Sequence, residues 1–332
     1  MLAWAVTDPG VSVASEKTDH FDGVRFHDAP VFARGGRHLL RWLVTRRPGE
    51  WRSVMDASPG PPPPERVAGS GLRVTFVGHA TLLIQTAGLN VLTDPIWSDR
   101  ASPVSWAGPR RRRPPGLRFA DLPPIDLVLV SHDHYDHLDL PTLRRLSAAF
   151  APRAVTGLGN APRLQAAGFP GAIELDWWQE VEIASGVRLW AVPARHFSSR
   201  GLHDRNRTLW AGFVLQGPGG SVLFAGDTGA GPHFAEIRRR LGPPRAALLP
   251  IGAFRPEWFM GPVHMSPADA VQAQRDLGAG TAIAMHFGTF RLADDGQDEP
   301  VETLHRVLAG GPPPAPRFWV LGFGEGRDVP EP

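Results

Sequence analysis

Side chains able to bind metal ions crowd into one short segment, Ser131-His132-Asp133-His134-Tyr135-Asp136-His137, which follows an apolar run. Residues two apart point the same way once a chain leaves a strand, so His132 and His134 can bind one ion together. Asp136 and His137 come after the turn and can face a second ion beside the first. Imidazole nitrogens and carboxylate oxygens suit zinc, and also iron or manganese. The segment therefore predicts a metal site rather than a solvated polar loop.

Three further residues of the same chemical kind follow later apolar runs. His196 follows VRLWAVPA, Asp227 follows SVLFAG in the turn AGDTG, and His286 follows TAIAM. Each lies just past the end of an expected strand, where loops gather at one edge of a sheet. An aspartate can bridge two cations about 3.5–4 Å apart, the separation used in two-metal hydrolysis. Any one of these residues alone is typical of a turn, but their joint placement favours metal binding.

The elements that must position these side chains begin at Leu72. The stretches LRVTFV, TLLIQT and LNVLT predict an antiparallel start, and DLVLVS (126–131) predicts a strand buried on both faces. The amphipathic stretch 140–150 predicts a helix. Further strands are predicted at 187–192, 209–215, 221–226, 246–251, 281–285 and 317–322, and further helices near 233–241, 267–277 and 300–309. This order is consistent with an α/β sandwich of two similar halves, which we assign to a catalytic domain at 71–332.

Residues 1–70 differ from the rest of the chain because they show no clear alternation of apolar and polar residues. Pro61–Pro64 can neither continue a helix nor supply donors to a sheet, so they predict an extended connector. We expect this segment to be an extension that packs on the core. The first 15 residues carry Asp8 and Pro9 and lack a basic start, which favours a frayed tail over a targeting segment.

Composition excludes several classes of protein. A net charge of +2 over 332 residues argues against a dedicated nucleic-acid binder, and the absence of cysteine excludes thiolate metal ligands. No run approaches the roughly 18–20 apolar residues of a membrane span. We therefore expect a cytoplasmic protein, with peripheral contact at a membrane left open. The run Arg110–Arg113 is either a solvated loop or a site of attraction to anionic lipid head groups, with Trp97 and Trp106 beside it.

The ordered set HxHxDH, followed by His, Asp and His after later strands, resembles the metallo-β-lactamase superfamily. The resemblance implies the αββα sandwich fold and two metal ions, for which we expect Zn²⁺, with iron or manganese as alternatives. It also implies a role for each of the seven residues: one ion is held by His132, His134 and His196, the other by Asp136, His137 and His286, and Asp227 bridges them.

Longer strings resemble one branch, the N-acyl-phosphatidylethanolamine-hydrolysing phospholipase D family, over about residues 70–310. They are Gly78-His79-Ala80-Thr81, Thr93-Asp94-Pro95-Ile96, Ala101-Ser102-Pro103, Gly108-Pro109-Arg110, Leu122-Pro123-Pro124-Ile125-Asp126, His134-Tyr135-Asp136-His137-Leu138-Asp139, Ala225-Gly226-Asp227-Thr228-Gly229, Trp258-Phe259-Met260, His264 with Pro267, and His286-Phe287-Gly288-Thr289-Phe290, with a fainter match from Asp19 to Phe26. The sequence departs from mammalian members at Phe197-Ser198-Ser199 and at Val263, which bears on the substrate rather than on the chemistry.

The resemblance implies a phosphodiesterase of lipid metabolism, in which a hydroxide bridging the two ions attacks phosphorus and phosphatidic acid is left behind. Asp136 or Asp227 would hold the hydroxide's proton. His264 resembles a histidine that faces the substrate phosphate, so we assign it to substrate binding or to protonation of the leaving oxygen; its alternative role is to cap the helix near Pro267.

Three other residues have candidate roles beside the metal ions. Asp94 and His79 lie at the ends of early strands, where a carboxylate could accept the free N–H of a ligand imidazole and orient it. For His79 the alternative is a hydrogen-bonded core histidine. Tyr135, the only tyrosine, either lines the substrate pocket or packs in the core.

Other functions on the same residues stay open. A lactonase or another ester or sugar-phosphate hydrolase would keep every ligand, and so would a metal-binding protein without turnover. A tRNA-processing nuclease fits less well because the basic balance is slight, and a di-iron oxygen reductase would need a carboxylate near His134 and an attached flavin domain. The expected partner is a phospholipid or another phosphodiester, and a homodimer is compatible with the sequence.

Overall fold

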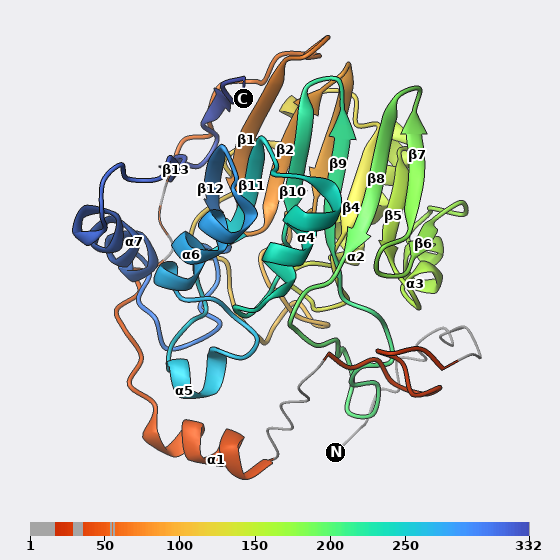
Figure 1. Cartoon of the computed structure of the whole chain (residues 1–332). Coiled ribbons are helices and arrows are strands. Elements are labelled where there is room, and N and C mark those ends of the chain that lie inside the picture. The colour runs from red at the N-terminus through yellow and green to blue at the C-terminus, as the bar shows by residue number, and fades with distance from the viewer. Residues whose placement is uncertain (1–16, 29–35, 54, 56, 332) are drawn as a thin grey trace.

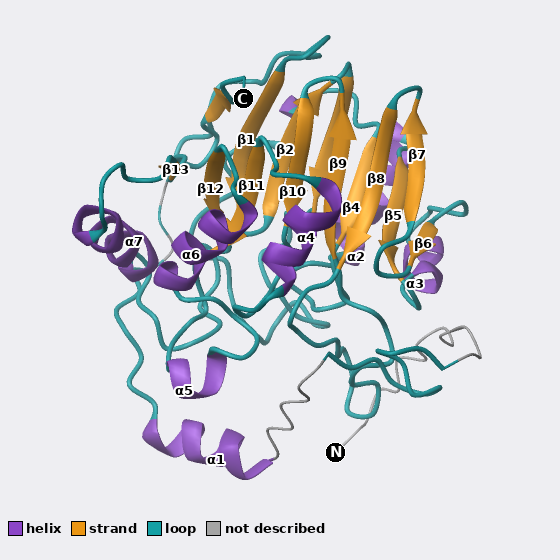
Figure 2. Ribbon diagram, in the orientation of Figure 1, coloured by secondary structure: helices purple, strands orange, loops and turns teal. Residues whose placement is uncertain are grey.

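The computed structural model describes residues 17–28, 36–53, 55 and 57–331. Two seven-stranded sheets face each other, and helices cover their outer faces (Figures 1 and 2). This is the αββα sandwich predicted from the sequence. The prediction of a frayed tail at residues 1–15 lies outside the described residues.

The first sheet has the strand order β14-β1-β2-β3-β4-β5-β6. Its strands are β1 (Leu72–Gly78), β2 (Thr81–Thr86), β3 (Leu89–Thr93), β4 (Leu127–Val130), β5 (Arg153–Gly157), β6 (Ile173–Leu175) and β14 (Gly326–Asp328). Short turns join β1 to β3 as antiparallel neighbours, whereas β3 to β6 are parallel. Parallel neighbours need crossover connections. Here they contain a short 3-10 helix (Phe119–Asp121), α2 (Leu140–Phe150) and α3 (Ala161–Ala166).

The second sheet repeats this plan in the order β13-β12-β11-β10-β9-β8-β7. Its strands are β7 (Glu180–Ala184), β8 (Val187–Val192), β9 (Gly212–Gly217), β10 (Gly220–Phe224), β11 (Ala246–Pro250), β12 (Thr281–Met285) and β13 (Phe318–Trp319). Antiparallel pairing from β7 to β10 changes to parallel pairing from β10 to β13. Its helices are α4 (His233–Leu241), α5 (Glu257–Met260), α6 (Pro267–Leu277) and α7 (Glu299–Gly310). The two halves therefore place the carboxyl ends of their parallel strands at one common edge.

The main core lies between the sheets, where Phe76 of β1 and Phe213 of β9 are buried in one apolar cluster. A second cluster fills the space between the first sheet and its helices, with Leu143 of α2 and Leu164 of α3 against Val128 of β4. Burial of both faces of β4 explains why its sequence is a continuous apolar run.

The N-terminal segment runs along the core and contacts both halves. Trp51 donates through Nε1 to the Asp295 carbonyl, and the side chain of Gln85 donates to the Pro64 carbonyl. Pro61–Pro64 belong to neither a helix nor a strand, as predicted. The structure adds a helix that was not predicted, α1 (Gly36–Thr45). The division of the chain at residue 70 stays a prediction.

A capping box starts α6. The Ser266 hydroxyl accepts a hydrogen bond from the Asp269 amide, and the Asp269 carboxylate accepts one from the Ser266 amide. The alternative that His264 caps this helix is therefore wrong.

Candidate metal centre

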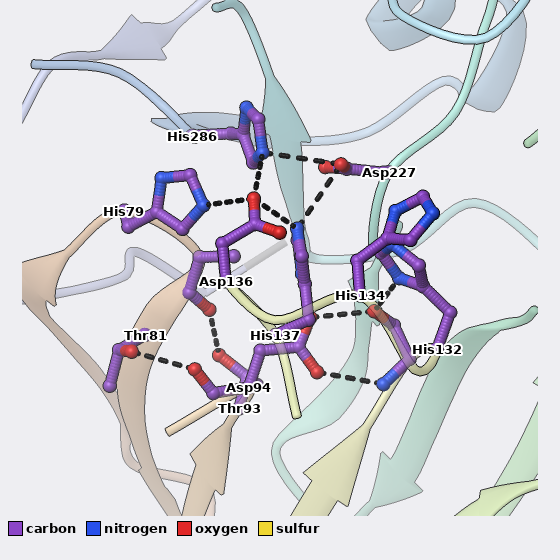
Figure 3. A network of polar contacts seen from close by, with 12 residues as sticks. His79, Thr81, Thr93, Asp94, His132, His134, Asp136, His137, Asp227 and His286 are labelled. Atoms are coloured by element: carbon purple, nitrogen blue, oxygen red, sulfur yellow. Dashed lines mark hydrogen bonds and ion pairs between the residues drawn. The ribbon is translucent and has the colours of Figure 1, made fainter. Parts of the chain in front are cut away.

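The seven predicted metal ligands meet at the common edge of the two sheets. Figure 3 labels six of them, all except His196. His132 to His137 follow β4, and His196, Asp227 and His286 follow β8, β10 and β12. These four strands all run toward this edge, so the side chains that leave their carboxyl ends converge there.

The backbone at this edge is strained in ways that aim side chains inward. His79, Asp94 and His286 have positive φ angles of 58°, 32° and 61°. Non-glycine residues rarely adopt such angles, which cost of order 1–3 kcal/mol each and persist where the surrounding structure enforces them. All three follow directly or closely on a strand end, so the chain turns sharply there and keeps these side chains in the site.

One donor set consists of three imidazoles. His132 Nε2 lies 2.8 Å from His134 Nδ1, which lies 3.2 Å from His196 Nε2. His196 Nδ1 donates to the Val263 carbonyl over 2.9 Å, which leaves Nε2 with a free lone pair. His132 is oriented in the same way, because its Nδ1 lies 2.9 Å from Ser131 Oγ, whose own proton goes to Asp94.

Burial keeps these three imidazoles neutral. It lowers the pKa of His134 to about 4 and the pKa values of His132 and His196 well below their usual range. Neutral imidazole is the form that binds metal, so little proton competition opposes a cation near pH 7. Three neutral imidazoles whose nitrogens lie this close together match the ligands of a shared cation.

The second donor set joins a carboxylate to imidazoles. Asp136 Oδ2 lies 3.3 Å from His137 Nε2, 3.6 Å from His286 Nε2 and 2.9 Å from His79 Nε2. His79 thus donates to a carboxylate and does not orient an imidazole. The orienting carboxylate is Asp94, whose Oδ2 accepts from His137 Nδ1 over 2.6 Å.

Asp227 lies between the two sets. Its Oδ2 is 3.1 Å from His137 Nε2, 3.2 Å from His286 Nε2 and 3.8 Å from His196 Nε2. Its Oδ1 is buried and has no hydrogen-bond partner. One carboxylate therefore reaches nitrogens of both sets, which is the arrangement that a bridging ligand needs.

The charges around Asp227 fit divalent cations. Burial alone would raise the pKa values of Asp136 and Asp227, but the adjacent imidazoles hold both well below the usual range. Burial would lower the pKa of His286, but Asp227 and Asp136 outweigh it and raise the pKa to about 9. His137 and His286 nevertheless make no well-aligned hydrogen bond through Nε2. Two ionised carboxylates therefore lie beside imidazole nitrogens that are not satisfied by hydrogen bonds. This set of nitrogen and oxygen ligands suits zinc, iron or manganese.

The remaining predicted residues lie around these sets. His264 Nδ1 is 3.9 Å from Asp227 Oδ2 and lacks a hydrogen-bond partner, and the His264 ring lies 5.0 Å from that of His196. The Tyr135 hydroxyl turns toward the loop after β8, where it donates to the Arg200 carbonyl. The Tyr135 ring packs beside Ile96.

Sequence reasoning assigned no role at the ligands to three contributors: Ser131 was cited only as part of the ligand segment, and Phe197 and Val263 only as departures that bear on the substrate. Ser131 bonds both Asp94 and His132, and the Val263 carbonyl orients His196. The Phe197 ring lies 4.5 Å from His134 and forms one wall of the site. Ser131 and Phe197 stand next to ligands in the sequence, which is a signal that could have found them, whereas a backbone carbonyl leaves no trace in the sequence.

Comparisons with known proteins bear on the family and the fold. A family model described as a β-lactamase superfamily domain matches residues 89–287. A protein of Mycobacterium tuberculosis of uncharacterized function is 39% identical over 311 residues, covering 91% of this chain and 82% of the relative. N-acyl-phosphatidylethanolamine-hydrolyzing phospholipase D 1 of Caenorhabditis elegans is 39% identical over 233 residues, covering 67% of this chain and 65% of the nematode protein. The solved structure of a metallo hydrolase from Ignicoccus hospitalis, Igni18, has a TM-score of 0.57 at 22% identity, covering 78% of this chain and 98% of that one, which shows a shared fold.

Proposed function

This chain belongs to the β-lactamase superfamily and is a metal-dependent hydrolase of the metallo-β-lactamase fold, and from that premise we propose that it hydrolyses a phosphodiester of the N-acyl-phosphatidylethanolamine type. The products would be phosphatidic acid and an ethanolamine that carries a fatty acyl amide. The similarity to the nematode enzyme supports this substrate class.

The observation that carries the proposal is the sharing of Asp227 by two donor sets. His132, His134 and His196 would hold one cation, and Asp136, His137 and His286 the other. Two bound divalent cations, for which we propose zinc, lower the pKa of water toward about 7 and offset charge on phosphoryl oxygens. A phosphodiester benefits from such a pair because charge develops on both the attacking and the leaving oxygen.

The chain's own carboxylates would handle the proton of the attacking water. Asp227 Oδ1 is ionised, buried and without a partner, so it can accept a hydrogen bond from that water. Asp136 is also ionised, but its Oδ2 already accepts from His79. We therefore assign the proton to Asp227 in preference to Asp136.

His264 would bind the phosphate. Burial lowers its pKa to about 4, so the imidazole is neutral near pH 7 and offers one N–H. A neutral N–H donates a hydrogen bond to a phosphoryl oxygen but is a weak proton source at that pH. Of the two roles predicted for His264, binding of substrate is thus favoured over protonation of the leaving oxygen.

The experiment that tests the function is hydrolysis of N-acyl-phosphatidylethanolamine vesicles by zinc-loaded protein, with release of phosphatidic acid as the readout. His134→Ala is the control for metal dependence, and a lactone substrate is assayed alongside. Release by the wild type and not by His134→Ala supports the phospholipase D reaction. Cleavage of the lactone alone would refute it and favour the lactonase alternative.

A further inference from the structure

The exposed large apolar side chains of the described residues gather around the edge that carries the metal centre. They are Val24, Leu39, Leu40, Leu43, Val44, Trp106, Leu202 and Trp258. Trp106, Leu202 and Trp258 lie in segments that leave the carboxyl ends of β3, β8 and β11. The others belong to residues 17–28 and to α1, and both segments lie along this same edge (Figure 1). Apolar patches concentrated on one side of a protein mark a surface of interaction.

Helix α1 contributes most of this surface. Leu39, Leu40, Leu43 and Val44 follow the helical spacing of a single face, and Leu40 and Val44 are 63% and 77% exposed. Trp42 lies on the other side of the helix and anchors it to the core. Its ring stacks on Phe259 of α5 at 5.1 Å, and its Nε1 donates to Asp294 over 2.9 Å. The apolar face of α1 therefore points away from the protein.

Charge decides what can cover this face. Residues 36–47 contain Arg37, Arg41, Arg46 and Arg47 and no carboxylate, and Arg46 is paired with Asp294 of the core. Arginine stems can lie along an apolar surface while the guanidinium reaches a phosphate. A second copy of the chain is disfavoured, because a two-fold contact through α1 would place these arginines against their own counterparts.

We infer that this edge docks on an anionic phospholipid bilayer, with the apolar face of α1 lying in the boundary between head groups and acyl chains. Leu202 and Trp106 are single side chains, 94% and 79% exposed, in separate loops. A fluid bilayer accepts such side chains without a complementary surface, whereas a protein partner would need one. The docked orientation turns the metal centre toward the lipid. The inference extends the proposed function, and it rests on that function in one respect: the proposed substrate is a lipid of the bilayer.

The structure removes part of the predicted segment from this contact. Arg111 is buried and donates to the carbonyls of Ile96 and Ser98, so it cannot meet lipid head groups. Arg110 is exposed and pairs with Asp99. Trp97 is half-buried and donates to the Leu117 carbonyl. Of the residues predicted to dip into a membrane, only Trp106 stays exposed.

The test is sedimentation of zinc-loaded protein with vesicles of phosphatidylcholine and phosphatidylglycerol in equal amounts, which contain no N-acyl lipid. Leu40→Glu/Val44→Glu places two charges on the exposed face of α1, and His305→Glu/Ala309→Glu places two at the same spacing on exposed positions of α7. The α1 variant is expected to lose about tenfold or more in vesicle partitioning, because its apolar contact is replaced by like-charge repulsion. The α7 variant is expected to partition as the wild type does. Equal melting temperatures and zinc contents show that both variants fold.

Charge reversal supplies a second readout. Arg37→Glu/Arg47→Glu should weaken partitioning on the mixed vesicles, and the difference should vanish on pure phosphatidylcholine. Wild-type protein that stays in the supernatant, or an α1 variant that sediments as the wild type does, overturns the inference. Concentration-dependent dimerisation that the α1 variant abolishes would overturn it in favour of a second copy. Because no vesicle here contains substrate, docking and hydrolysis can fail independently of each other.

Discussion

Asp94 offers a test of how the metal centre is oriented. It lies at the end of β3, is fully buried, and accepts hydrogen bonds from the Ser131 amide at 2.7 Å, from Ser131 Oγ at 2.6 Å and from His137 Nδ1 at 2.6 Å. Asp94→Asn removes the charge and replaces one acceptor oxygen by an NH₂ group. If the NH₂ group takes the position of Oδ2, it lies against Ser131 Oγ and His137 Nδ1. Both of their hydrogen bonds are then lost, because an NH₂ group accepts none.

The expected cost follows from these contacts. A hydrogen bond to a charged group contributes about 1.5–3 kcal/mol, so loss of two lowers the free energy of unfolding of the metal-free protein by roughly 3 kcal/mol or more. Loss of the carboxylate that orients a ligand imidazole typically weakens metal binding by about 10–100-fold. Zinc affinity should therefore fall in that range even where Asp94→Asn folds.

Competition with a chromophoric chelator measures the zinc affinity, and urea unfolding of metal-free protein measures stability. Asp139→Asn is the matched control, because Asp139 is also buried and accepts from Ser98 and Thr142 but is bonded to no ligand imidazole. It should lose stability and keep its zinc affinity. Unchanged zinc affinity in Asp94→Asn, or an equal loss in Asp139→Asn, would refute the reasoning.

Three further predictions concern stability. Arg245→Met should lower the free energy of unfolding by about 3 kcal/mol and speed proteolysis near the C-terminus. The reason is that the buried guanidinium donates to four carbonyls, two of them in residues 329–330. Denaturant unfolding measures the first effect and limited digestion the second. Burial lowers the pKa of His20, but hydrogen bonds to Asp176 and Asp19 outweigh it and raise the pKa above its usual 6.5. The stabilisation is thus full below about pH 6.5 and is lost as the pH rises through the folded pKa, so the melting temperature should fall across that window in the wild type. It should fall less in Asp176→Asn, which keeps the hydrogen bond between His20 and Asp19. Removal of metal should lower stability by about 4 kcal/mol for each proposed site, relative to protein held at a free zinc concentration 1,000 times the dissociation constant. Calorimetry with and without a chelator checks this, and an equal melting temperature in both would contradict it.

Much of the fold could be predicted because its strands are short apolar runs that precede residues with metal-binding chemistry. The end of β4, the turn after β10 and the end of β12 each combine the two signals, so the strands and the candidate ligands support one another. The predicted spans 187–192, 246–251 and 281–285 match strands of the structure to within one residue.

The elements that were missed are those whose sequence lacks that pattern. Strand β14 (Gly326–Asp328) has no apolar side chain and is held by pairing with β1, including an ion pair between Arg73 and Asp328. Strand β7 (Glu180–Ala184) is an edge strand with no fully buried residue, so burial imposes little alternation on it. The predicted strand at 209–215 begins instead at Gly212, because Leu209 and Trp210 pack in a separate cluster with Phe26 of the N-terminal segment. These contacts are long-range, and no local window contains them.

Each donor set draws on both sheets. The residues between β4 and α2 supply His132, His134, Asp136 and His137, whereas His196, Asp227 and His286 come from the second sheet. Neither half of the sandwich could assemble either set alone, so bound ions would act as cross-links between two structurally similar lobes. The chain could be cut between β6 and β7, and metal uptake would then report reassembly of the two fragments. The same dependence constrains how the two lobes can diverge in evolution, because a mutation that shifts one sheet relative to the other would separate the ligands and weaken metal binding.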